Sequence, residues 1–219
     1  MIVTTEAIVL RARKQGETSK IVTLYTRGFG KLNVIAKGAR EMKSKFGGAL
    51  EMFARSTVVF YKREKQDALN LLSKAETLDS NAGIMQSLKK MEAAMAIVEL
   101  MLHAMHDEEA NEELFDLLAG TLHTIARSEE REAPFLQLRF YLRFLKQVGF
   151  EIDVRESSEF SPHLLELLRW LEEEPAETSA EPGEKEFRQL HSFFQAYFAE
   201  HVPGMSLRSM KSANVFGQL

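Results

Sequence analysis

The chain has 219 residues, of which 45% are apolar and 27% are charged, and its formal net charge is −4. These values are ordinary for a soluble globular protein with one large domain or two small ones. The sequence contains no cysteine, which excludes disulfides, thiolate zinc sites and cysteine nucleophiles. It also contains no apolar run of membrane-spanning length and no N-terminal secretory pattern, so we expect a cytoplasmic protein.

The charges are divided unevenly along the chain. Residues 1–65 contain 14 Lys and Arg against 5 Asp and Glu, a balance of +9, whereas the remaining residues contain 14 against 27, a balance of −13. Chance clustering on solvated surfaces is one explanation. The change of sign coincides with a change of hydrophobic period near residue 80, however, which favours two modules with different partners.

The first module is predicted to be a barrel of β-strands. Runs rich in valine, isoleucine, threonine and aromatic residues alternate with period two, as in half-buried strands. They cover Thr4–Leu10, Ile21–Thr26, Leu32–Ala36, Glu51–Lys62 and Leu69–Thr77. Five short strands in a basic domain over residues 1–79 favour an OB-type barrel. Counting strands leaves an SH3-like barrel as the alternative.

The second module, residues 80–219, is predicted to be all-helical, which makes the chain an α+β protein. Apolar residues at three- and four-residue spacing predict helices over 81–105, 111–127, 134–149, 162–171 and 185–201. Ser80 or Asn81 and then Asn111 are the expected N-caps, and Gly149 is expected at the C′ position, just beyond the end of its helix. An acidic loop is expected over 172–184, and a basic tail over 205–216.

The strongest candidate site is the basic loop Lys37–Lys45, which follows the third predicted strand. Its cations are Lys37, Arg40, Lys43 and Lys45, and two more, Arg27 and Lys31, lie in and after the preceding turn. Lysine and arginine clustered between barrel strands are typical of a surface that binds phosphate backbones. A solvated run of charges is the alternative. Phe29 and Phe46 occupy turns, where their rings could stack on bases.

A second candidate site lies on the third predicted helix. Arg139, Arg143 and Lys146 are spaced along one helix beside Phe140 and Phe144. Cations around an apolar groove could capture an acidic peptide that ends in an aromatic residue. An amphipathic helix with extended basic side chains is the alternative.

Other kinds of site are not expected. His103 and His106 are residue types that bind metals, but they lack a second pair of ligands, so we expect no metal. The sequence shows no nucleophile with a base, no Walker A sequence and no nucleophile elbow. We therefore expect a protein that is not an enzyme and that needs no cofactor.

Several of these segments resemble the RecO family of bacterial recombination mediators. The matching segments are Thr5–Leu10, Gly16-Glu17, Ile21–Leu24, Gly30-Lys31, and Lys37–Arg40 with Ser44. In the helical module the similarity is mostly one of spacing, at Glu113–Leu122, Phe135–Phe150 and Leu207–Ser212. The family joins an N-terminal OB barrel to a C-terminal helical domain. Many members carry a four-cysteine zinc site after the position of Phe150, where this chain has Glu, Asp and Ser, so no zinc is expected.

The resemblance implies a mediator of DNA repair and recombination that is associated with the nucleoid. Its barrel would bind single- and double-stranded DNA without reading sequence and would promote strand annealing. The resemblance also implies RecR as a partner, binding to the acidic tail of single-strand-binding protein (SSB), and help in loading RecA onto SSB-coated DNA. A helical interaction scaffold with an incidental basic barrel, or an RNA-binding OB protein, are the alternatives.

Overall fold

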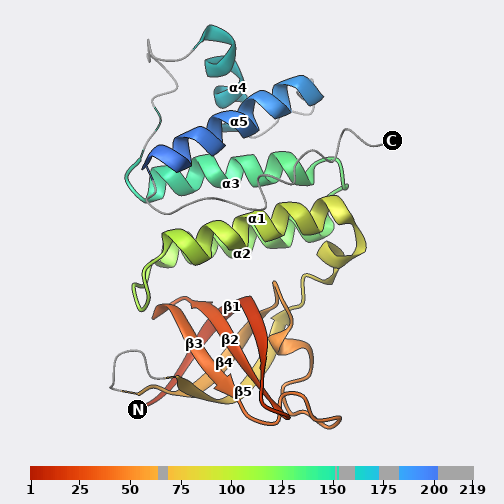
Figure 1. Cartoon of the computed structure of the whole chain (residues 1–219), viewed down its shortest axis with the longest axis vertical. Helices are drawn as coiled ribbons and strands as arrows, with labels where there is room; N and C mark the ends of the chain where they lie inside the picture. The colour runs from red at the N-terminus through yellow and green to blue at the C-terminus, as the bar shows by residue number, and fades with distance from the viewer. Residues whose placement is uncertain (64–68, 151, 153–160, 173–182, 202–219) are drawn as a thin grey trace. The chain divides into compact units, whose positions relative to one another are not determined.

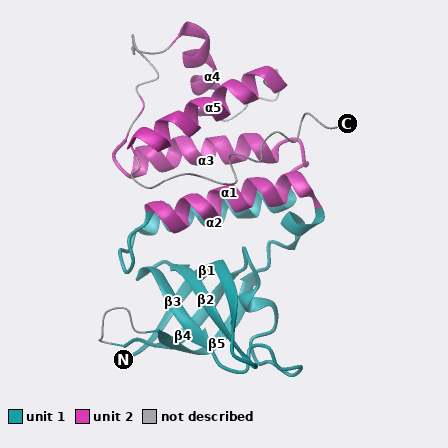
Figure 2. Cartoon of the chain, viewed as in Figure 1, with its two compact units in different colours: residues 1–86, 105–127 teal, residues 87–104, 128–219 magenta. Residues whose placement is uncertain are grey.

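The computed structural model describes residues 1–63, 69–150, 152, 161–172 and 183–201 (Figure 1). Most of the expected acidic loop, most of the segment that follows Phe150 and the whole basic tail lie outside the described residues. The described chain forms five strands and then five α-helices, so the predicted α+β fold is confirmed. It divides into two compact units, residues 1–86 with 105–127 and residues 87–104 with 128–219 (Figure 2).

The five strands form a closed barrel in the order β1-β2-β3-β5-β4, in which β4 also pairs with β1. Their bounds are β1 Ile2–Gln15, β2 Ser19–Thr26, β3 Gly30–Ala36, β4 Arg55–Tyr61 and β5 Asn70–Asp79. Strands β3 and β5 are parallel, and the other neighbours are antiparallel. A five-stranded barrel of this kind is an OB-type barrel, which confirms the preferred reading of the strand pattern.

Period-two alternation decides which side chains fill the barrel. The inward-facing side chains include Val9, Val22, Leu24, Val34, Phe60 and Leu72. A β-bulge lies between Val9 and Arg11 on β1. Beyond this bulge Ala12 packs against the core, whereas Arg11 and Arg13 are exposed. The bulge therefore directs two cations of the same strand to the outer surface.

Helix α2 (Glu112–Arg127) belongs to the barrel unit rather than to the helical unit, so the units do not follow one boundary at residue 80. Phe115 of α2 stacks on Tyr25 of β2, with 6.4 Å between ring centroids, and both rings are fully buried. Burial, with a smaller effect of the Glu109 charge, raises the pKa of Tyr25 to about 12. Near the other end of α2, Arg127 Nη2 lies 3.2 Å from Asp79 Oδ2.

The second unit contains α1 (Leu88–Ala104), α3 (Ala133–Gln147), α4 (Pro162–Glu172) and α5 (Glu184–His201). Its core is aromatic. Tyr141 of α3 meets the rings of Phe194 and Phe198 of α5 edge-on, at 5.7 and 5.2 Å between centroids. Burial raises the pKa of Tyr141 above its ordinary value, because an ionised phenol would lose its hydration there. The second unit is thus packed around rings that face inward.

Two of the expected helix caps are confirmed. The backbone N–H of Leu114 donates to Asn111 Oδ1 at 2.9 Å, so Asn111 caps the start of α2. Gly149 has a φ of +86° just beyond α3, a left-handed conformation that favours glycine at a helix C-terminus.

The cap expected at Ser80 or Asn81 was wrong. Asn81 has a φ of +49°, and its side-chain amide donates to the carbonyl of Phe53 at 2.9 Å. A short 3-10 turn, η2 (Ala82–Gln86), follows, and α1 begins only at Leu88. Asn81 therefore joins the end of the barrel to this turn and lies several residues before the start of α1.

Candidate nucleic-acid interface

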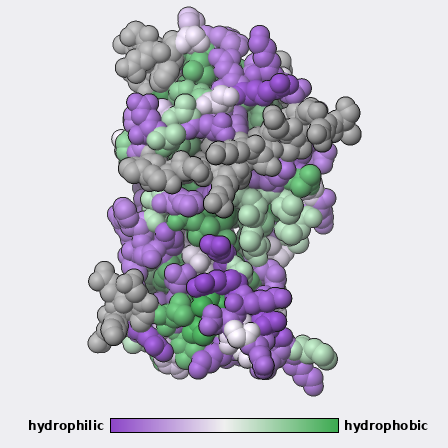
Figure 3. Space-filling model, viewed as in Figure 1, coloured by the Kyte–Doolittle hydropathy of each residue, from purple (hydrophilic) through white to green (hydrophobic). Residues whose placement is uncertain are grey.

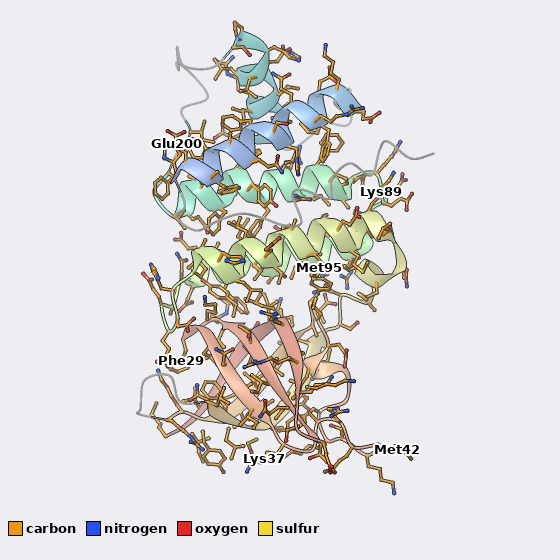
Figure 4. The ribbon with its side chains drawn as sticks, viewed as in Figure 1. Phe29, Lys37, Met42, Lys89, Met95 and Glu200 are labelled. Carbon is orange, nitrogen blue, oxygen red and sulfur yellow. The ribbon has the colours of Figure 1, made fainter. Side chains whose placement is uncertain are left out.

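The basic loop extends from the end of β3, on the side of the barrel away from α2, as the labels of Lys37 and Met42 show (Figure 4). Met42 is fully exposed. The side chains of Lys37, Arg40, Lys43 and Lys45 are all exposed. The loop turns at Gly38, which has a φ of +72°. These cations are therefore accessible, as contacts to a phosphate backbone require.

Arg40 fixes the loop to the turn between β1 and β2. Its backbone N–H donates to the carbonyl of Thr18 at 2.9 Å, and its guanidinium Nη1 donates to the carbonyl of Gly16 at 2.8 Å. Two segments more than twenty residues apart in sequence are thereby held together. Arg40 thus has a structural role in addition to its charge.

Three cations of β1, Arg11, Arg13 and Lys14, were absent from the predicted site, and all three are exposed. They precede the turn to which Arg40 binds, so they add positive charge near the basic loop. The sequence Leu10-Arg-Ala-Arg-Lys14 contains the signal that could have identified them. Period two turns Ala12 toward the core and places Arg11 and Arg13 together on the outer face.

Arg27 and Lys31 lie at the other end of β2 and β3 from the basic loop. Arg27 Nη1 donates to Asp116 Oδ2 at 3.1 Å, and the guanidinium carbon lies 4.7 Å from the centroid of the Phe115 ring. Lys31 Nζ lies 3.2 Å from Asp107 Oδ1. The hydrogen bond from Arg27 holds the pKa of Asp116 below its ordinary value. The structure therefore places these two predicted site residues on acidic groups of segment 107–116, apart from the loop cations.

The stacking role predicted for Phe46 was wrong, because its ring is only 3% exposed and belongs to the barrel core. The ring precedes the 3-10 turn η1 (Gly47–Leu50), whose Ala49 and Leu50 are also buried in the barrel core. Phe29 is partly buried and packs edge-on against Phe60 at 6.0 Å between centroids. Lys62 Nζ lies 5.0 Å from the centroid of the Phe29 ring.

The apolar groove predicted on α3 was also wrong. Phe140 and Phe144 are each 1% exposed, because they lie on the face of the amphipathic helix that packs into the core. Arg139 is half-buried, with its guanidinium carbon 5.1 Å from the centroid of the Trp170 ring. Arg143 and Lys146 are exposed. The helix therefore separates the predicted cations from the predicted apolar side chains.

Neither a metal cluster nor a membrane span is present in the described ranges. No group of three or more His, Cys, Asp or Glu residues is arranged there to hold a metal ion, and His103 and His106 do not join such a group. No helix of the described chain has both the length and the apolar character that a bilayer crossing requires.

The chain matches two family models, "Recombination protein O N terminal" over residues 1–81 and "Recombination protein O C terminal" over residues 85–159. The DNA repair protein RecO of Salinibacter ruber is 39% identical over 141 residues, which are 63% of this chain and 54% of that protein. RecO of Chlorobium limicola is 37% identical over 69% of this chain and 57% of that protein. RecO of Alkaliphilus metalliredigens is 32% identical over 75% of this chain and 61% of that protein. The matches thus span little more than half the length of these relatives. The N-terminal family model covers the barrel strands, and the C-terminal family model begins just before the first α-helix. The chain therefore belongs to the RecO family of DNA repair proteins.

Proposed function

We propose that this chain is a mediator of DNA repair and recombination that binds single- and double-stranded DNA through backbone phosphates. The observation that carries the proposal is the group of exposed cations Lys37, Lys43 and Lys45, on a loop that Arg40 fixes to the barrel. Phosphate contacts position a protein on DNA but carry no sequence information. Binding should therefore be independent of sequence.

The further steps of the proposed function follow from charge and from family membership. Cations that neutralise two strands reduce the repulsion between them, so the same surface would promote annealing without a nucleotide cofactor. Membership of the RecO family supports RecR as a partner and a role in loading RecA onto SSB-coated DNA. Because its proposed ligand is DNA, the protein would be associated with the nucleoid in the cytoplasm.

The proposed function is tested by binding of the unaltered protein to labelled single-stranded DNA, duplex DNA and RNA of matched length. Both forms of DNA should bind, and log K should fall linearly with log salt concentration. Tighter binding to RNA than to either DNA would favour the RNA-binding alternative. A lack of binding to all three would favour the interaction scaffold.

We also propose that the acidic tail of SSB binds the helical unit through exposed cations of α3. The burial of Phe140 and Phe144 leaves Arg143 and Lys146 as the candidates. Arg143→Glu should weaken binding of a labelled SSB C-terminal peptide by about tenfold, since it removes a hydrogen bond to a charged group.

Arg188→Glu is the matched control, because Arg188 is an exposed arginine of the same unit on another helix, α5. Fluorescence anisotropy should show an effect of Arg143→Glu on the peptide and little effect on naked DNA. Equal weakening by the two variants would contradict a specific site on α3.

A further inference from the structure

An outward-facing row of apolar side chains crosses several strands of the barrel. Tyr61 of β4 pairs directly with Leu71 of β5, and Leu71 pairs with Ile35 of β3. The row continues from Ile35 to Ile21 of β2, and at its other end Tyr61 pairs with Ile2 of β1. The next residues along each of these strands, such as Phe60, Leu72 and Val34, lie in the core, so alternation turns this row outward.

Much of this row is accessible to solvent. Tyr61 is 45% exposed and Ile2 is 62% exposed, Leu71 and Ile35 are half-buried, and Ile21 is buried at 5% exposure. Apolar surface is visible on the barrel in the space-filling view (Figure 3). An accessible apolar surface crossed by paired strands marks an interaction site more often than isolated exposed residues do.

Cations lie beside one end of this row. Lys37 follows Ile35 by two residues and begins the basic loop just after β3 ends at Ala36. Arg13 pairs directly with Ile21, and both cations are exposed. The arrangement of apolar side chains next to cations is complementary to a single nucleic-acid strand, which has bases on one side and phosphates on the other.

We infer that Tyr61, Leu71 and Ile35 form the surface on which the bases of a single DNA strand lie. The inference rests on the proposed function, in which Lys37 and its neighbours bind the phosphates. A duplex keeps its bases paired inside the helix, so it uses the cations alone. The surface formed by Tyr61, Leu71 and Ile35, here called the apolar strip, therefore adds a preference for single strands. The cations beside it bind both forms of DNA.

The strip begins on β3, at the edge of the β2–β3 face on which OB folds commonly bind oligonucleotides, and extends from there onto β5 and β4. On that face, the hydroxyl of Thr23 donates to Asn33 Oδ1 at 2.7 Å, which leaves a polar pair. Further along β2, Tyr25 is covered by Phe115 of α2. Ile35 of β3, with Leu71 of β5 and Tyr61 of β4, thus provides an apolar surface beside the polar pair of Thr23 and Asn33.

The test compares Tyr61→Ala, Tyr61→Phe and the unaltered protein. The probes are a labelled thymidine oligonucleotide of about 12 nucleotides, within the site size of an OB fold, and a duplex of the same length. Tyr61→Ala should weaken single-strand binding by about tenfold, as expected when one stacked base loses its ring. Its salt dependence and its duplex affinity should stay unchanged, and Tyr61→Phe should keep full affinity.

Leu78→Ala is the control, because Leu78 of β5 is an apolar residue with 51% exposure that lies outside the strip. Unchanged single-strand affinity of Tyr61→Ala, or equal weakening for duplex DNA, would overturn the inference. A change in oligomeric state without loss of DNA binding would also overturn it, since the strip would then contact protein. If the unaltered protein binds neither form of DNA, the proposed function itself fails.

Discussion

Replacement of Lys37, Lys43 and Lys45 together by alanine should make DNA binding much less dependent on salt concentration. Each lysine that contacts a phosphate releases condensed counterions when it binds. Loss of all three contacts should lower the slope of log K against log salt concentration by about 2 for single strands and by about 3 for duplex DNA. Affinity should fall alike for unrelated sequences, because phosphates carry no sequence information. Anisotropy titrations at several salt concentrations give both quantities.

Arg40 is left in place in this variant, because its loss would also release the loop from the carbonyl of Gly16. A matched control removes the same amount of charge elsewhere, at Lys74, Arg131 and Arg188, whose side chains are 65–66% exposed. The control variant should keep the slope of the unaltered protein. A folded triple-lysine variant with an unchanged slope would show that the loop does not contact phosphates.

The strands of the barrel and the exposure of its loop cations could be predicted from the sequence. Period-two alternation identified the five strands, since a side chain that faces the core is followed by one that does not. The same alternation would have revealed Arg11 and Arg13, had the bulge near Leu10 been expected. The exposure of the loop cations was also predictable, because charged side chains in a glycine-containing loop are rarely buried.

The direction of aromatic side chains could not be predicted from spacing alone. The sequence places Phe46 in a turn, which predicts an exposed ring, but the ring packs in the barrel core just before η1. Phe140 and Phe144 are next to arginines in sequence, yet a helix turns consecutive residues about 100° apart. The rings therefore face the core while Arg143 faces solvent.

The acidic partners of Arg27 and Lys31 could not be predicted from the sequence for a different reason. Asp107 and Asp116 follow them by more than seventy residues, and no local pattern reports a contact over that separation. The opposite charges of the two parts of the sequence indicated two modules with different partners. In the structure, part of the acidic excess instead belongs to the barrel unit and binds its cations.

Gly30→Ala should destabilise the barrel unit more than any other glycine-to-alanine change in the turns of the barrel. Gly30 has a φ of +61°, and an added Cβ would overlap the backbone carbonyl of Glu109. The left-handed backbone alone costs an alanine about 1–3 kcal/mol. The overlap would also displace segment 107–116, whose Glu108 N–H donates to the carbonyl of Lys31 at 2.8 Å.

Gly16→Ala is the control for this experiment. Gly16 has nearly the same φ, +60°, but an added Cβ there would meet nothing within 4 Å. Urea unfolding should therefore show that Gly30→Ala lowers the free energy of unfolding by roughly 1–3 kcal/mol more than Gly16→Ala does, which is the usual cost of overpacking. Equal losses in the two variants would mean that segment 107–116 does not rest on the β2–β3 turn. Arg27 and Lys31 would then be released from their acidic partners and would return as candidates for binding DNA.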